Sequence, residues 1–203
     1  TEQGVVAANY GVQVFGGHGY IKEWGMEQIL RDSRIATIYE GTTGIQALDL
    51  IGRKTLMDKF KQLKIFTTEM RQFVMPLLLS TKTSRAMRKY AWKTLKMSLK
   101  WRYLAFRMAL QAKRDRDSVG AGSVDFLMFS GYAFMAYMWM QMAAKAEQKL
   151  NSSEGDSQFN QDKLISAEFF FERYLPQSTA HAKTISANLG SLMDMPNSYF
   201  ADS

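Results

Sequence analysis

The sequence predicts an all-α fold, a helical bundle with little or no strand. Apolar residues recur at spacings of three and four along most of the 203 residues, and strand-like alternation is scarce. Only three prolines interrupt the chain. Because 46% of the residues are hydrophobic, the helices can bury a sizeable core.

Glycines delimit the first helices. A helix is predicted over residues 2–15 and should stop at Gly16 and Gly17, which suit the C-terminal cap of a helix. Residues 16–25 contain four glycines and are predicted to form a loop. The next helix is expected over residues 26–36.

Six more helices are predicted after that point. Either Thr42 or Thr43 can cap the first of them. Pro76 should kink or end the second. The polar stretch 151–156 is expected to be a loop tip. The expected helices cover about residues 43–51, 66–77, 93–110, 124–148, 162–174 and 179–192.

The segment 82–116 is strongly basic, with Asp115 as its one acidic residue. An apolar stripe along its helix is predicted to face the core, together with nearby aromatic residues: Leu95, Leu99, Tyr103, Phe106 and Leu110, with Trp92 and Trp101. A second stripe is basic: Lys93, Lys96, Lys100 and Arg107. The favoured interpretation is a solvated face of a bundle helix. With a net charge of +7, a site for RNA, a membrane surface or an acidic partner stays open.

Residues 126–144 contain no charged residue, a length that could span a membrane. Polar residues such as Ser130 and Gln141 dilute the stretch, which favours a helix buried in a bundle. The composition changes near residue 58, which predicts one domain over 1–58 and a second over 59–203.

The absence of cysteine excludes disulfides and thiolate chemistry. The two histidines, His18 and His181, lie far apart in the sequence, so no metal site is predicted. No signal peptide is visible after Thr1. We expect a cytoplasmic protein and a chain that is the carboxyl-terminal piece of a longer polypeptide.

The residues with catalytic potential lie in the first quarter of the chain. Glu40 precedes Gly41, and a carboxylate beside a glycine lets a substrate approach closely, as a general base requires. Three motifs occur in order: Gln-x-x-Gly-Gly-x-Gly-Tyr at 13–20, Arg31-Asp32, and Tyr-Glu-Gly-Thr at 39–42. Arg31 and Asp32 are expected to hold the Glu40 loop in place.

Together these motifs, over residues 1–54, resemble the carboxyl-terminal helical domain of the acyl-CoA dehydrogenase family. The later part resembles the helical extension of a bacterial branch that includes methylmercaptopropionyl-CoA dehydrogenase. The resemblance implies that FAD oxidises an acyl-CoA thioester to a trans-enoyl thioester. It also implies a homo-oligomer, either a dimer or a tetramer, and electron-transfer flavoprotein as the electron acceptor. No nucleic-acid partner is expected.

The resemblance also assigns roles to residues. Glu40 matches the general base, Gly41 the glycine that gives the thioester room, and Thr42 a position that contacts FAD and can also be a helix cap. Tyr39 is expected to line the acyl pocket or the core. Three more residues match a segment that reaches the dinucleotide of an adjacent subunit: Gln13, Gly16 and Gly17. Gly44 stands where many relatives have a glutamine, so one adenine contact is expected to be lost or replaced.

The favoured hypothesis is therefore the carboxyl-terminal segment of an FAD-dependent acyl-CoA dehydrogenase, inactive by itself. The alternative is a non-catalytic basic helical module that docks on a membrane surface or an acidic partner. A degenerate relative that keeps the fold for assembly only is a third possibility, which an intact Glu40 disfavours.

Overall fold

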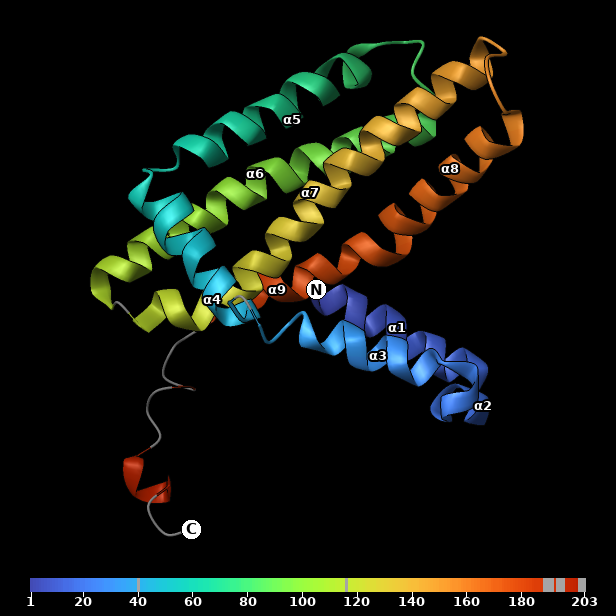
Figure 1. Cartoon of the computed structure of the whole chain (residues 1–203). Coiled ribbons are helices and arrows are strands. Elements are labelled where there is room, and N and C mark those ends of the chain that lie inside the picture. The colour runs from blue at the N-terminus through green and yellow to red at the C-terminus, as the bar shows by residue number, and fades with distance from the viewer. Residues whose placement is uncertain (40, 116, 188–191, 193–195, 201–203) are drawn as a thin grey trace. The chain divides into compact units, whose positions relative to one another are not determined.

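The structure is a computed structural model that describes residues 1–39, 41–115, 117–187, 192 and 196–200. The described part is about 85% helix and contains no strand, which confirms the predicted all-α class. Two compact units make up the chain, Thr1–Asp49 and Leu50–Ser203 (Figure 1). This division comes earlier than the domain boundary predicted near residue 58, which stays a prediction.

The first unit contains four short helices. They are α1 (Glu2–Phe15), α2 (Gly17–Tyr20), α3 (Met26–Ile35) and α4 (Thr43–Leu48), with a 3₁₀ turn at Lys22–Trp24. Both α2 and α3 pack against α1. The predicted helices 2–15 and 26–36 are confirmed to within one residue.

The predicted loop over 16–25 is wrong in part, because α2 and the 3₁₀ turn occupy much of it. Gly19 explains the difference. A side chain at Gly19 would lie 2.4 Å from the carbonyl oxygen of Val12 and 2.8 Å from the Cβ of Phe15. The glycines therefore allow a close approach between helical segments as well as a turn.

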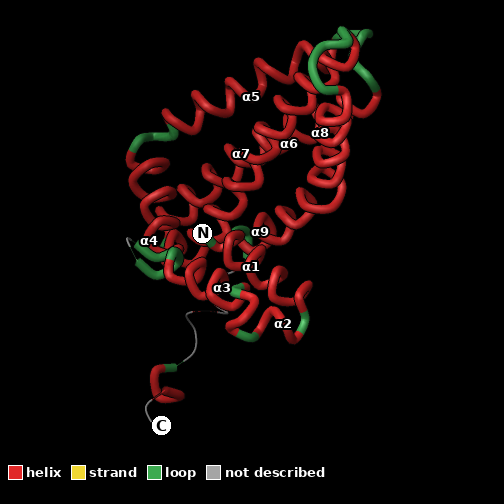
Figure 2. The backbone as a smooth tube through the Cα atoms, turned by 45° about the vertical axis from the view of Figure 1, so that its right-hand side comes forward, coloured by secondary structure: helices red, strands yellow, loops and turns green. Residues whose placement is uncertain are grey.

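The second unit is built from long helices. A π-helical segment (Asp49–Met57) leads into α5 (Lys61–Leu79), α6 (Arg85–Arg114), α7 (Asp117–Asn151) and α8 (Ser157–Phe169). A π turn (Phe170–Tyr174) and a 3₁₀ turn (Leu175–Gln177) join α8 to α9 (Ser178–Thr184). Figures 1 and 2 show these helices lying side by side as a bundle. The central pair is α6 and α7, with α5 against α6 and with α8 and α9 against α7.

Local chemistry sets the helix ends in this unit. The Ser84 hydroxyl accepts a hydrogen bond from the backbone N–H of Met87 and begins α6. The Asp156 carboxylate accepts one from the N–H of Phe159 at 3.1 Å, so the polar break at 151–156 is confirmed. Pro76 does not end α5, which continues to Leu79, because a proline in the last turn blocks few further hydrogen bonds.

The core of this unit is one continuous cluster centred on α7. In the described part of the chain, α7 is the one helix that is long and apolar enough to cross a membrane. The central helix of a water-soluble bundle can have the same length and composition. The inner face of α7 is buried against its neighbours, as predicted for residues 126–144. The largest fully buried side chains of the cluster are Phe126, Phe129, Phe171, Ile51, Met70, Leu104, Met108 and Met140.

The predicted core stripe of α6 is wrong. Of its five members only Leu95 is buried, and the other four are about half exposed: Leu99, Tyr103, Phe106 and Leu110. Trp101 is buried as predicted, whereas Trp92 is 49% exposed. The core uses another face of the same helix, on which small residues stand between bulkier ones: Met87, Tyr90, Ala91, Thr94, Leu95, Met97, Ser98, Trp101, Leu104, Ala105 and Met108. Small residues let α6 and α7 approach closely, and that advantage outweighs the bulk of the residues on the outer face.

Buried tyrosines tie the helices of this unit together. The rings of Phe66 and Phe73 on α5 contact the ring of Tyr137 on α7, with centroids 5.6 and 5.8 Å apart. The Tyr137 hydroxyl donates a hydrogen bond to the carboxylate of Glu69 at 3.1 Å. Burial and this carboxylate raise the pKa of Tyr137 to about 12.

We predict that Tyr137 makes the stability of the protein pH-dependent in the alkaline range. Because its pKa is higher in the folded state than the ordinary 10.0, the unfolded chain loses the phenol proton first as pH rises. The free energy of unfolding should fall between pH 10.0 and about 12, by about 1–2 kcal/mol from this residue. Urea unfolding across that range should show a flatter dependence for Tyr137→Phe. Tyr199→Phe, a change at an exposed tyrosine, is the control and should keep the pH dependence of the wild type. The same pH dependence of the free energy of unfolding in the wild type and in Tyr137→Phe would contradict the prediction.

Candidate functional site

Every residue with a predicted role in catalysis or cofactor binding belongs to the first unit. Glu40, the predicted base, lies outside the described residues, so its role stays a prediction. Tyr39, Gly41 and Thr42 border it directly. The other group, Gln13 with Gly16 and Gly17, lies where α1 ends and α2 begins.

The turn between α1 and α2 is open on its glycine side. Gly16 has a φ of 61°, a left-handed conformation that favours glycine, and its backbone N–H donates to the carbonyl of Gln13. No atom lies within 4 Å of the position that a Cβ would take on Gly16 or Gly17. Both glycines and Gln13 are exposed. A ligand could therefore approach the backbone of Gly16 and Gly17 without meeting a side chain.

Aromatic packing holds this turn in shape. The ring of Trp24 contacts the rings of Phe15 and His18, with centroids 6.3 and 5.0 Å apart. His18 lies in α2, and its ring packs edge-on against the ring of Trp24.

The turn that leads to Glu40 is held by Arg34. Its guanidinium donates to the hydroxyl of Thr37, which in turn donates to the carbonyl of Arg34 at 3.0 Å. Thr37 is buried, and Tyr39 beyond it is 53% exposed. Arg31 pairs with Glu27 one turn earlier on α3 at 2.9 Å. Because Glu40 lies outside the described residues, the expected role of Arg31 and Asp32 in holding the Glu40 loop stays a prediction.

After Glu40 the backbone takes a conformation that suits glycine. Gly41 has a φ of 91°, and a Cβ there would lie 2.7 Å from the side-chain amide nitrogen of Gln46. Thr42 is the N-cap of α4, since its hydroxyl accepts from the N–H of Ile45 at 3.5 Å. Thr43 donates to the carboxylate of Glu2, which places this segment beside the start of α1.

The structure therefore separates the predicted residues into two groups. Tyr39, Gly41 and Thr42 lie near the start of α1, whereas Gln13, Gly16 and Gly17 lie at its other end. At 1.5 Å per residue, the 14 residues of α1 put these groups about 20 Å apart. Gln46, to which no role was assigned, also belongs to the first group, because α4 brings its side-chain amide beside Gly41.

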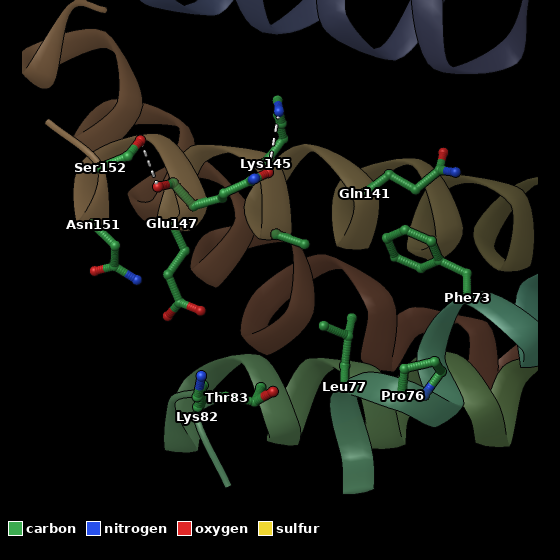
Figure 3. Close-up of a pocket in the computed structure, with 12 residues that line it drawn as sticks. Phe73, Pro76, Leu77, Lys82, Thr83, Gln141, Lys145, Glu147, Asn151 and Ser152 are labelled. Atoms are coloured by element: carbon green, nitrogen blue, oxygen red, sulfur yellow. Dashed lines mark hydrogen bonds between the residues drawn. The ribbon is translucent and has the colours of Figure 1, made fainter. Parts of the chain in front are cut away.

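Three cavities among the described residues of the second unit are lined by none of these residues. One of them, of about 580 Å³, lies between α5 and the end of α7 (Figure 3). Figure 3 shows Pro76 and Leu77 from α5 on one side, and Glu147 and Asn151 from α7 on the other. Within the described residues, no cluster of His, Asp or Glu is suited to hold a metal ion.

Sequence reasoning also missed an acid–histidine pair. His181 Nδ1 on α9 lies 2.8 Å from the carboxylate of Asp125 on α7, and both side chains are about a quarter exposed. The ring of Tyr132 lies 5.8 Å from that of His181. No local pattern could have found a pair that is separated by 56 residues.

Comparison with known proteins matches both parts of the chain. Residues 1–56 match the profile of a family described as "Acyl-CoA dehydrogenase, C-terminal domain". Residues 66–196 match "Acetyl-CoA dehydrogenase C-terminal like".

Three relatives illustrate the similarity. The 3-methylmercaptopropionyl-CoA dehydrogenase of Ruegeria pomeroyi is 34% identical over 95% of this chain and 32% of its own length. The broad-specificity linear acyl-CoA dehydrogenase FadE5 of Mycobacterium tuberculosis is 30% identical over 98% of this chain and 33% of its own length. The caffeyl-CoA reductase-Etf complex subunit CarC of Acetobacterium woodii is 51% identical over 20% of this chain and 11% of its own length.

The first two relatives match nearly the whole chain, yet the chain spans only about a third of their length. The order of the two matched families agrees with the two predicted parts, the carboxyl-terminal helical domain and then the helical extension. With family profiles over both parts, this all-helical chain belongs to the acyl-CoA dehydrogenase family.

Proposed function

We propose that this chain is the carboxyl-terminal part of an FAD-dependent acyl-CoA dehydrogenase, which converts an acyl-CoA thioester to its α,β-unsaturated product. The observation that carries the proposal is the Tyr39-Glu40-Gly41-Thr42 segment inside a family match that runs from residue 1 to 56. Two local features support it. The left-handed backbone at position 41 explains why a glycine stands there, and the helix cap at position 42 explains the threonine.

In this proposal Glu40 takes the proton from the carbon next to the thioester carbonyl. A carboxylate is suited to this step because it can hold the proton while the product forms. Gly41 keeps Cβ atoms away from the reacting region, and the Gln46 amide beside it supplies a hydrogen-bonding group there. Thr42 fixes the start of α4 and hence the direction in which the chain leaves Glu40.

We propose that the residues at the two ends of α1 serve two different FAD molecules. When bound, FAD supplies the acceptor for the two electrons of the reaction. Open backbone at Gly16 and Gly17 suits a pyrophosphate, and the exposed Gln13 amide can donate to it. Because these residues lie about 20 Å from the Glu40 segment, we propose that they hold the dinucleotide of an adjacent subunit. The complete enzyme is then a homo-oligomer.

The names of the relatives suggest the substrate class and the electron acceptor. The two relatives that match nearly the whole of this chain are named as dehydrogenases of CoA thioesters. The Acetobacterium protein is named as a subunit of an Etf complex. We propose an acyl-CoA substrate and electron-transfer flavoprotein as the partner that reoxidises the enzyme.

Anaerobic flavin absorbance tests the proposal directly. The complete enzyme should be purified with bound FAD, and a series of acyl-CoA thioesters of rising chain length should be added. The expected result is loss of the oxidised flavin band with at least one thioester and formation of the matching enoyl-CoA. A preparation without flavin, or a flavin that no thioester reduces, would contradict the proposal. The 203-residue chain alone should catalyse no turnover.

A further inference from the structure

The outer face of α6 carries an apolar ridge that the bundle leaves uncovered. Its members are between 47% and 56% exposed: Trp92, Leu99, Tyr103, Phe106 and Leu110. The last four lie at spacings of three and four along the helix, and Trp92 lies two turns before Leu99 on the same face. From residue 92 to residue 110 the helix axis rises about 27 Å. A row of exposed apolar residues of this length marks a contact with another molecule.

The ridge is bordered by positive charge on both sides. No acidic residue occurs in the 30 residues of α6. At about 100° per residue, Lys100 and Arg102 lie on opposite sides of the ridge. The ammonium group of Lys96 lies 5.2 Å from the centre of the Trp92 ring, and the guanidinium of Arg107 lies 3.4 Å from the Tyr103 hydroxyl. Lys96 and Arg107 therefore lie against aromatic residues of the ridge, and in the described part of the chain neither of them forms an ion pair.

A cavity lies on each flank of the ridge. The first, of about 380 Å³, lies between α5 and α6, and its lining includes three cations, Lys59, Lys64 and Arg102, beside the rings of Tyr103 and Phe106. Neither Asp nor Glu lines it. Lys59 and Phe60 at its edge both have a positive φ, of 53° and 63°, which is uncommon for residues other than glycine.

The second cavity, of about 240 Å³, lies between α6 and the segment that leads into α9. It is lined by three lysines, Lys93, Lys96 and Lys100, together with Ser178 and Thr179, again without a carboxylate. Glu172, just outside, pairs with Lys93 and Lys89 at 2.9 and 3.0 Å and offsets part of the charge at this end. These two lysines lower the pKa of Glu172. Within the described residues, neither Lys96 nor Lys100 pairs with a carboxylate, so both keep this flank positive.

We propose that the outer face of α6 docks on the surface of an anionic membrane. The apolar ridge would enter the boundary between headgroups and acyl chains, as aromatic side chains at a membrane interface do. The lysines and arginines would extend to the headgroups, and the two cavities would receive their phosphates. Charge spread along a whole helix matches the diffuse negative potential of a lipid surface better than the discrete acids of a protein partner. The proposal does not depend on the dehydrogenase activity.

Vesicle flotation with the complete enzyme tests this proposal, because only there are the other parts of the protein free to cover the face of α6. The enzyme should bind vesicles of mixed phosphatidylcholine and phosphatidylglycerol, bind vesicles of phosphatidylcholine alone roughly tenfold more weakly, and lose affinity as salt is added. Equal binding to both kinds of vesicle would overturn the proposal, since apolar residues elsewhere in the chain could cause it. Binding to a single-stranded RNA or to an acidic helical peptide, with no vesicle binding, would also overturn it in favour of that partner.

Two pairs of matched variants locate the contact. Lys96→Glu with Lys100→Glu should weaken binding roughly tenfold to thirtyfold, while Lys145→Glu with Lys149→Glu, which changes the net charge equally at the end of α7, should have little effect. Tyr103→Ser with Phe106→Ser should weaken binding, while Phe159→Ser with Ile165→Ser on α8 removes side chains of similar exposure and should not. Circular dichroism checks that each variant stays folded. Equal losses within a pair would contradict docking through α6.

Discussion

Replacing Glu40 with glutamine in the complete enzyme is expected to abolish dehydrogenation while FAD stays bound. Glutamine has nearly the same shape and volume as glutamate but cannot hold the substrate proton, so the first step loses its base. We expect the rate of flavin reduction by an acyl-CoA thioester to fall roughly a thousandfold or more. Stopped-flow absorbance measures that rate, and the spectrum before mixing measures the bound flavin.

A second glutamate of the same unit serves as the control. Glu23 is exposed in the 3₁₀ turn before α3, and Glu23→Gln makes the same chemical change away from the proposed centre. It should leave the rate and the flavin content unchanged. Normal reduction of the flavin in Glu40→Gln would remove Glu40 from its proposed role. Loss of flavin from that variant would instead point to a structural role in the site.

Truncation of Phe171 to alanine is expected to destabilise the second unit more than any surface change. Phe171 is fully buried, and its ring stacks on Tyr90 of α6 with centroids 4.6 Å apart and planes 5° from parallel. Its backbone carbonyl also accepts a hydrogen bond from Lys93 at 2.8 Å, so the residue joins the π turn to α6. The free energy of unfolding should fall by about 3–5 kcal/mol, the usual cost of a buried Phe→Ala cavity.

The neighbouring Phe169 provides a matched control. It has the same side chain at the end of α8 but is 61% exposed. Phe169→Ala should change the free energy of unfolding by only about 0.5 kcal/mol, as for most surface substitutions. Urea unfolding followed by circular dichroism compares the two variants. Similar midpoints would show that the ring of Phe171 contributes little to the packing of α6 against the π turn.

Local sequence signals predicted most of the helices because those signals act over a few residues. Gly16 ends α1 where expected, and the Thr42 hydroxyl caps α4. Asp156 begins α8 after the polar break. Each of these depends on the conformation or hydrogen bonding of one residue and its near neighbours, so the sequence contains the necessary information.

Long-range packing could not be predicted in the same way. The bulkier stripe of α6 looked like the core, yet the bundle buries the stripe with Ala91, Thr94 and Ser98. Both stripes have helical spacing, and only the approach of α7 decides between them. The contact of Tyr137 with Glu69 and that of His181 with Asp125 likewise join residues 68 and 56 positions apart.

The sequence by itself determined the helical class, the ends of most helices and the order of motifs by which the chain belongs to its family. Those properties depend on spacing and on short-range chemistry along one chain. Only the tertiary structure decided which face of α6 is buried, that Gln46 lies beside Gly41, and that the two groups of predicted residues stand at opposite ends of α1. These depend on how close two backbones can approach, and that distance is set by the side chains of both segments together.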